Sequence, residues 1–172
     1  MSGERAHAME IHRFSADGPI PNNADLPVVI HRGVLRAEPD RATRFERLFA
    51  SNGWTNGWRD GLYDFHHFHS TAHEALGVAR GTATVLIGGP SGLAIELEAG
   101  DVLILPAGTG HKREAASADF LLVGAYADGR DWDICRGEPD QLARVLDNIG
   151  AVPKPRRDPV LGAAGPLVQS DG

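Results

Sequence analysis

Residues 61–81, GLYDFHHFHSTAHEALGVARG, decide how the rest of the chain is interpreted. Four histidines and one glutamate fall within nine residues of this stretch. If the chain is extended here, successive side chains alternate between two faces, so His67 and His69 point to the same side. Residues 70–72 predict a turn, after which Glu74 opens a second strand. Two imidazoles and a carboxylate that face inward from neighbouring strands form a metal site that still lacks one ligand.

The missing ligand has a candidate in residues 100–115, GDVLILPAGTGHKREA. An apolar run that is typical of a buried strand ends at Pro106, and a glycine-rich turn follows it. His111 opens the next predicted strand. Imidazoles together with a carboxylate suit divalent transition metals, namely Fe, Mn, Ni, Cu or Zn. Such a ligand set leaves an octahedral ion with open positions for water, a substrate or dioxygen.

These two stretches resemble the two sequence motifs of the cupin superfamily. The first motif, G-x5-H-x-H-x4-E-x6-G, is matched by Gly61, His67, His69, Glu74 and Gly81. The second, G-x5-P-x-G-x2-H-x3-N, is matched by Gly100, Pro106, Gly108 and His111, and Ala115 stands where the motif has Asn. The resemblance implies an all-β fold, a cupin double-stranded β-helix or jelly-roll barrel with two flanking helices. It also implies one divalent transition metal per chain, held by His67, His69, Glu74 and His111.

A narrower resemblance extends over more of the chain. The segments IPNN, HHFHSTAHE, WDICRG and DPVLGAAGPL are similar to those of small bacterial single-domain cupins of the YjlB-like type. This narrower resemblance implies no particular activity. The predicted metal ligands therefore remain the main guide to function.

Composition and length favour one cupin domain over residues 1–172. The barrel core is expected at about residues 60–127, N-terminal strands and a helix at 10–53, and a C-terminal helix with an extended tail at 128–172. The net charge of −6 argues against nucleic acid as a partner. No apolar run is long enough to span a membrane, and the N-terminus does not read as a signal peptide. With a single cysteine, these features favour a cytoplasmic protein.

Short strands separated by glycine-rich turns fill residues 62–126, and further strands are predicted at 10–14 and 28–35. Residues 39–52 and 139–149 are predicted to form amphipathic helices. Trp54 and Trp58 lie between the first helix and the motif. They either line the mouth of a pocket or pack on the barrel as a cover.

Tyr63, Phe65 and Leu76 share the face of the predicted ligands and are expected to line the substrate pocket. Arg113 shares a face with His111, so it either meets a carboxylate of the substrate or forms a surface salt bridge. Tyr126 ends a strand from which it can reach the pocket.

His66 and His73 are predicted to face away from the site by the same alternation. Either replaces a ligand only if its strand slips or bulges by one residue. His73 is the more serious alternative of the two, although support for a ligand is the expected use of either. Cys135 lies outside both motifs and is expected to be a buried, inert thiol.

Two functions fit this pattern. The first is a metal-dependent enzyme, dioxygenase-like or isomerase-like, that acts on a small organic substrate. The alternative is a non-catalytic, metal-dependent protein that binds or senses a small molecule. Motifs for a serine nucleophile or a phosphate-binding loop do not occur.

A homodimer is the predicted assembly. Phe68 lies between two inward-facing histidines and is therefore expected to point outward. The next strand presents small, mostly apolar residues on the same outer face. Such a face needs a cover, either a second subunit or the chain's own C-terminal helix and tail.

Overall fold

The structure is a computed structural model that describes residues 7–36 and 39–168. The last four residues of the predicted tail lie outside the described residues. The strands are β1 (Ala8–His12), β2 (Val28–Arg32), β3 (Trp54–Asp60), β4 (Glu74–Arg80), β5 (Thr82–Ile87), β6 (Leu93–Glu98), β7 (Val102–Leu105), β8 (His111–Ala116) and β9 (Leu121–Ala127). The helices are α1 (Arg41–Ser51), the short 3-10 helix η1 (Pro139–Gln141) and α2 (Leu142–Ala151).

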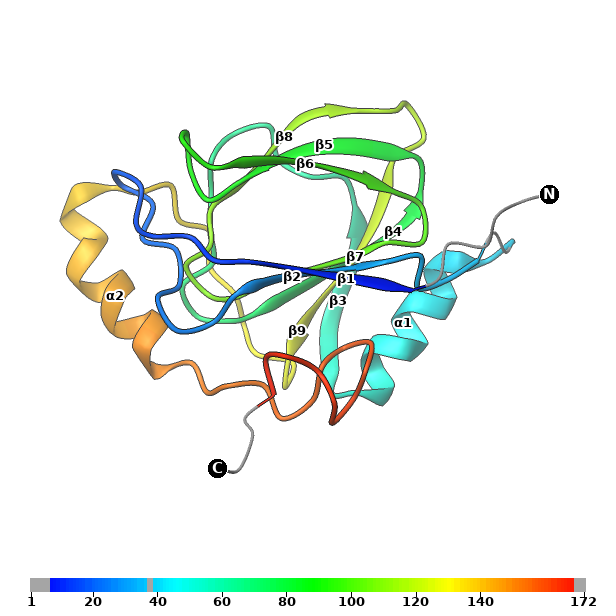
Figure 1. Cartoon of the computed structure of the whole chain (residues 1–172). Helices are drawn as coiled ribbons and strands as arrows, with labels where there is room; N and C mark the ends of the chain where they lie inside the picture. The colour runs from blue at the N-terminus through cyan, green and yellow to red at the C-terminus, as the bar shows by residue number, and fades with distance from the viewer. Residues whose placement is uncertain (1–6, 37–38, 169–172) are drawn as a thin grey trace.

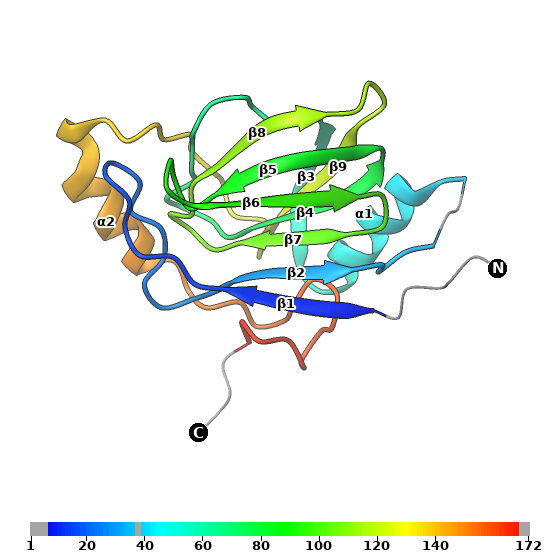
Figure 2. The same cartoon turned by 45° about the horizontal axis from the view of Figure 1, so that its top comes forward.

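Two antiparallel sheets face each other, and the core lies between them (Figures 1 and 2). One sheet has six strands in the order β1-β2-β7-β4-β9-β3, and the other has three in the order β6-β5-β8. Leucine, isoleucine and valine side chains from both sheets form one buried cluster between them. The predicted all-β class, a jelly-roll barrel with two flanking helices, is therefore confirmed.

The apolar pattern of the sequence explains where each strand lies. β7 is buried along its whole length because it lies between β2 and β4 in the larger sheet. On β6, Ile95 and Leu97 are buried and Glu96 is exposed, as expected for a strand with one face toward solvent. The predicted turn at residues 70–72 also precedes β4, which begins at Glu74.

Trp54–Asp60 forms an edge strand, β3, which was not predicted from the sequence, and it pairs with β9 with a bulge between Thr55 and Trp58. The regular strand predicted before the turn at residues 70–72 was wrong, because residues 61–73 form no regular strand. Two isolated bridges, His67 with His111 and Phe68 with Cys135, are among the contacts that hold this segment. The segment stays extended at these bridges, so the predicted alternation still separates His67 from Phe68.

Helix α1 covers the outer face of β4. The Asp40 carboxylate caps the helix by accepting a hydrogen bond from the N–H of Thr43, and Gly53 follows the helix with φ +80°. The Phe45 ring lies directly on Gly77, where a Cβ atom would come within 2.7 Å of the ring. A glycine at this position therefore lets the helix approach the sheet, and the small residues of β4 are covered by the chain itself.

Helix α2 covers Phe68 in the same way. Phe68 is 1% exposed and packs with Ile20, Cys135 and Val145 in a separate apolar cluster. The ring points away from the barrel interior, as predicted, but its cover comes from α2 of the same chain. Phe68 therefore gives no reason to expect a second subunit. Within the described residues, neither helix has the length and apolar character that crossing a bilayer requires.

The C-terminal tail is fastened to the larger sheet by a buried pair of side chains. His31 Nε2 on β2 lies 3.2 Å from Asp158 Oδ2, and both side chains are fully buried. Asp158 Oδ1 accepts hydrogen bonds from the N–H groups of Val160 and Leu161. Asp158 thus joins a turn in the tail to the sheet, and Leu167 beyond it is buried against the α1 side of the core.

We expect Asp158→Ala to lower the free energy of unfolding by about 3 kcal/mol, because it removes the partner of the buried His31 Nε2 and of two N–H groups in the tail turn. Urea titration measures the change. Asp147→Ala, which removes an exposed aspartate from α2, is the control and is expected to change stability by less than about 0.5 kcal/mol. Equal stability of the two variants would show that the tail is not fastened through Asp158.

Candidate metal centre

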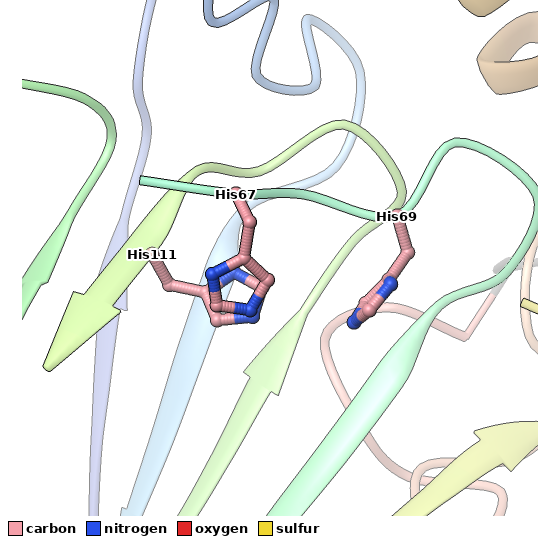
Figure 3. A group of neighbouring side chains, drawn as sticks. All are labelled: His67, His69 and His111. Carbon is pink, nitrogen blue, oxygen red and sulfur yellow. The ribbon is translucent and has the colours of Figure 1, made fainter. Parts of the chain in front are cut away.

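Three histidines from two segments converge at one end of the barrel. His67 and His69 come from the extended segment before β4, and His111 is the first residue of β8. Figure 3 shows the three rings directed toward a common region. One ring nitrogen from each residue lies within 4.8 Å of the others, and all three side chains are buried. The group could hold a metal ion.

Backbone pairing between the two motifs sets this geometry. His67 and His111 exchange N–H···O bonds of 3.2 and 2.9 Å, and the N–H of Gly108 donates to the His69 carbonyl at 2.7 Å. Gly108 has φ +92°, and a Cβ atom there would come within 2.6 Å of the Asn22 carbonyl oxygen. Only glycine fits this turn without strain, which explains why the turn before His111 needs it.

Each imidazole has its Nδ1 beside a backbone carbonyl oxygen. The pairs are His67 with Phe65 at 3.0 Å, His111 with Thr109 at 3.0 Å and His69 with Asp133. Because a carbonyl oxygen can only accept, Nδ1 must carry the proton in each ring. In a neutral imidazole this leaves a lone pair on Nε2. All three rings are therefore in the tautomer that binds a metal through Nε2.

Glu74 completes the group from the start of β4. Its carboxylate oxygens lie 3.1 Å from His69 Nε2 and 3.4 Å from His111 Nε2. Glu74 Oε1 and His111 Nε2 are both buried without a hydrogen-bond partner. Facing lone pairs in a buried site repel one another unless a proton or a cation lies between them. The residues present therefore fit a divalent cation.

The protonation equilibria in the site reflect burial and the Glu74 charge. Burial, together with the neighbouring His111, lowers the pKa of His67 to about 3. Burial also acts to lower the pKa of His69, but the adjacent Glu74 carboxylate outweighs it and the pKa is raised. Burial would raise the pKa of Glu74, yet the two neighbouring imidazoles hold it well below its usual range. Glu74 is thus a carboxylate, as metal binding requires.

Two aromatic side chains hold the Glu74 carboxylate in place. The hydroxyl of Tyr126, on β9, donates to Glu74 Oε2 at 2.7 Å and accepts a hydrogen bond from Trp58 Nε1 at 2.9 Å. The pKa of Tyr126 is raised by burial and by the Glu74 charge, so the hydroxyl keeps its proton and remains a donor. Glu74 Oε2 is thereby anchored, and Oε1 is left for another partner.

The histidine group opens into a cavity of about 330 Å³. The lining residues are Trp58, Asp60, Gly61, Leu62, Tyr63, His67, His69, Glu74, His111, Arg113, Tyr126 and Trp132. Of the residues predicted for the substrate pocket, Tyr63, Arg113 and Tyr126 are in this lining. A larger open hollow of about 830 Å³ lies between β1 and β2 on one side and the three-stranded sheet on the other. Among the described residues, no histidine lines it.

Phe65 and Leu76 do not line the cavity, contrary to the prediction. Leu76 does share a face with Glu74, but it lies deeper along β4 and is fully buried in the core between the sheets. The Phe65 ring stacks on Tyr63 and is covered by the Arg136 guanidinium, 4.0 Å from the ring centroid. Sharing a face with the ligands therefore did not place either residue at the cavity.

The sequence left open whether Trp54 and Trp58 line a pocket, and of these two Trp58 lines the cavity and donates to Tyr126. The structure adds two contributors that the sequence did not reveal. Trp132 stacks on Tyr126 with 5.4 Å between ring centroids and meets the edge of His69. The carbonyl of Asp133 fixes the tautomer of His69. Residues 132–135, WDIC, belong to a segment that resembles the YjlB-like cupins, but nothing in their spacing links them to His69.

The alternatives to the predicted ligands lie elsewhere. His73 Nδ1 accepts from the N–H of Ala107 at 2.9 Å, and its Nε2 lies 3.1 Å from the Pro153 carbonyl oxygen. Both ring nitrogens of His73 therefore have backbone partners, and His73 does not replace a ligand. His66 is outside the group as well. Burial and Asp133 raise the pKa of the Cys135 thiol to about 11, as expected for an unreactive cysteine.

Two antiparallel sheets with a histidine-lined cavity at one end of the barrel define the protein as a cupin. No family model matches the chain. The uncharacterized protein YjlB of Bacillus subtilis (strain 168) is 36% identical over 156 residues, which are 91% of this chain and 92% of that protein. The chain therefore belongs to the YjlB-like family of cupins.

Solved structures show weaker similarity. RmlC from Streptococcus suis, in complex with dTDP-D-xylose, is 12% identical over 74% of this chain and 72% of that chain, with a TM-score of 0.41. Procruciferin, an 11S globulin from Brassica napus, is 13% identical over 78% of this chain, with a TM-score of 0.37. The chain spans 28% of the procruciferin chain.

Tyr126→Phe removes the hydrogen bond that anchors Glu74. We expect it to weaken the binding of Ni²⁺ or Co²⁺ about tenfold, since loss of a partner that orients a ligand has effects of this size. Competition with a metal-sensitive dye measures the affinity. Tyr63→Phe removes a hydroxyl from the same cavity and is the control. Unchanged affinity in Tyr126→Phe would show that Glu74 does not depend on this hydrogen bond.

Proposed function

We propose that the protein is a metal-dependent enzyme that holds one divalent transition metal through His67, His69, Glu74 and His111. The observation that carries this proposal is the cluster of three histidine ring nitrogens beside Glu74, in which the buried Glu74 Oε1 and His111 Nε2 have no hydrogen-bond partner. A cation bound here would give both of these atoms a partner. Fe, Mn, Ni, Cu and Zn all accept this mixture of nitrogen and oxygen ligands.

A bound metal would supply Lewis acidity or a place for dioxygen beside a small organic substrate. The chain's own residues would bind the substrate and orient the ligands. Trp58, Tyr63 and Trp132 form apolar walls that bind a substrate and exclude water from it. Tyr126 keeps Glu74 in one orientation through its hydroxyl.

The remaining acids and bases of the cavity favour dioxygenase-like over isomerase-like chemistry. An isomerase needs a group that takes a proton from the substrate and returns it. Among the described residues lining the cavity, the acidic groups other than Glu74 are Asp60, Tyr63 and Tyr126. Asp60 is exposed at the rim, and Tyr126 has a raised pKa and already donates to Glu74. Neither of these two groups is a ready base beside the histidines, and the Tyr63 side chain, which stacks on Phe65, is 47% exposed.

Metal analysis followed by an oxygen-uptake screen tests the proposal. The protein is purified without a histidine tag or chelator, its metal content is measured, and small organic acids, diketones and catechols are screened for oxygen consumption. Oxygen consumption that stops on chelation supports the dioxygenase-like function. Metal-dependent stabilisation by a compound, without turnover of that compound, would instead indicate a protein that binds or senses it.

His111→Gln and His67→Ala are expected to lose bound metal, whereas His66→Ala retains it, because His66 lies outside the group. Chelation should lower the melting temperature of the wild type and of His66→Ala, but not that of the two ligand variants. The stabilisation by metal is about 2.7 kcal/mol at one hundred times the dissociation constant. Equal metal content in all four proteins would contradict the proposed ligands.

The homodimer and the cytoplasmic location remain predictions. Because α2 covers Phe68, a dimer would have to use another surface, and light scattering at micromolar concentration measures the mass directly. The support for a reducing compartment is that the single cysteine cannot form an internal disulfide.

A further inference from the structure

Arg113 is placed to bind a ligand on the same side of β8 as the metal centre. Register with β5 pairs His111 with Ile87 and Arg113 with Val85, so the alternation of β8 is regular between the two residues. Their side chains therefore point to one face, and their Cα atoms are about 7 Å apart along the strand. Both residues line the cavity, His111 at its buried end and Arg113 toward its mouth.

The guanidinium of Arg113 is weakly engaged within the described part of the chain. Its Nη2 lies 3.9 Å from Asp64 Oδ2, and the two side chains are 38% and 72% exposed. An exposed pair at this distance contributes little. By contrast, Arg59 is similarly exposed at 43% but donates two hydrogen bonds, of 2.6 and 3.1 Å, to the Glu46 carboxylate. The N–H donors of the Arg113 guanidinium are therefore available to a ligand in the cavity.

The cavity shared by the histidines and Arg113 is lined by the aromatic residues Trp58, Tyr63 and Trp132 as well as by Asp60. The backbone N–H of Arg113 donates to the Tyr63 carbonyl at 2.9 Å, which places the two residues side by side. The space therefore suits a small, flat organic molecule with polar groups at its two ends.

We propose that the ligand is a small organic anion. Oxygen atoms at one end bind the metal, and a carboxylate at the other end binds Arg113. This inference rests on the proposed function, because the first contact requires the metal. The net charge of −6 repels anions from the protein as a whole, so a local cation is needed to attract one. A guanidinium matches a carboxylate in geometry as well as charge.

Three probes that share one chelating group test the inference. Catechol, 3,4-dihydroxybenzoate and 3,4-dihydroxybenzamide present the same pair of hydroxyls. The last two have far ends of similar size, but only the carboxylate is charged and offers two acceptor oxygens to a guanidinium. Titration calorimetry with Ni²⁺-loaded protein measures each affinity. We expect the acid to bind at least about fivefold more tightly than the amide, which corresponds to about 1 kcal/mol. The ratio of acid to amide affinity should fall as salt is added, because the ion pair of Arg113 with the ligand carboxylate would be partly exposed.

Arg113→Gln is expected to reduce the ratio of acid to amide affinity to about one and to leave catechol affinity unchanged. Arg59→Gln, which removes a similarly exposed arginine away from the cavity, should keep the wild-type ratio. Tight binding of catechol with equal affinities for acid and amide would overturn the carboxylate site alone, as would a ratio that survives in Arg113→Gln. Failure of catechol to bind the metal-loaded protein would overturn the proposed function on which the inference rests.

Discussion

The hydrogen bond from each imidazole Nδ1–H to a backbone carbonyl is the interaction on which the site depends. It fixes the tautomer, so the lone pair of each ring is on Nε2, and the Nε2 atoms of His69 and His111 lie beside the Glu74 carboxylate. For His67 and His111 the accepting carbonyl lies two residues earlier in the chain, so each segment orients its own ring. His69 differs, since its acceptor is the carbonyl of Asp133. The loop after β9 must therefore be in place before the third ring is oriented.

The sequence predicted the histidine group because alternation in an extended chain is a local property. It could not predict the part of Asp133, which lies 64 residues from His69. The Asp133 carbonyl lies beside His69 Nδ1 and its carboxylate accepts hydrogen bonds from Ser70, and neither contact is a local property of the sequence. Alternation also misplaced Leu76. Two residues along β4 from Glu74 is a displacement of about 7 Å. That distance takes the side chain from the cavity into the core between the sheets. Spacing along a strand predicts the face on which a side chain lies, but not how far that side chain lies from the cavity.

The same limit explains why the sequence could not show which segment covers Phe68. A sequence shows that a face is apolar and so needs a cover, but it does not show which segment provides the cover. Here α1 lies on β4 through Phe45 and Gly77, and α2 lies over Phe68 through Val145. The two helices were predicted as amphipathic elements, yet their partners are set by loops whose course has no periodic signal. The covering surface therefore came from the chain itself.

The cavity has two chemically distinct walls, and Tyr126 belongs to both. One wall carries the imidazoles and Glu74, and the other carries indole rings. The Tyr126 hydroxyl donates to Glu74, while its ring stacks on Trp132, which in turn meets the edge of His69. A molecule that displaces Trp132 would therefore remove contacts from both Tyr126 and His69. Since the Tyr126 hydroxyl also anchors Glu74, Tyr126 joins the aromatic side of the cavity to the carboxylate of the proposed ligand set.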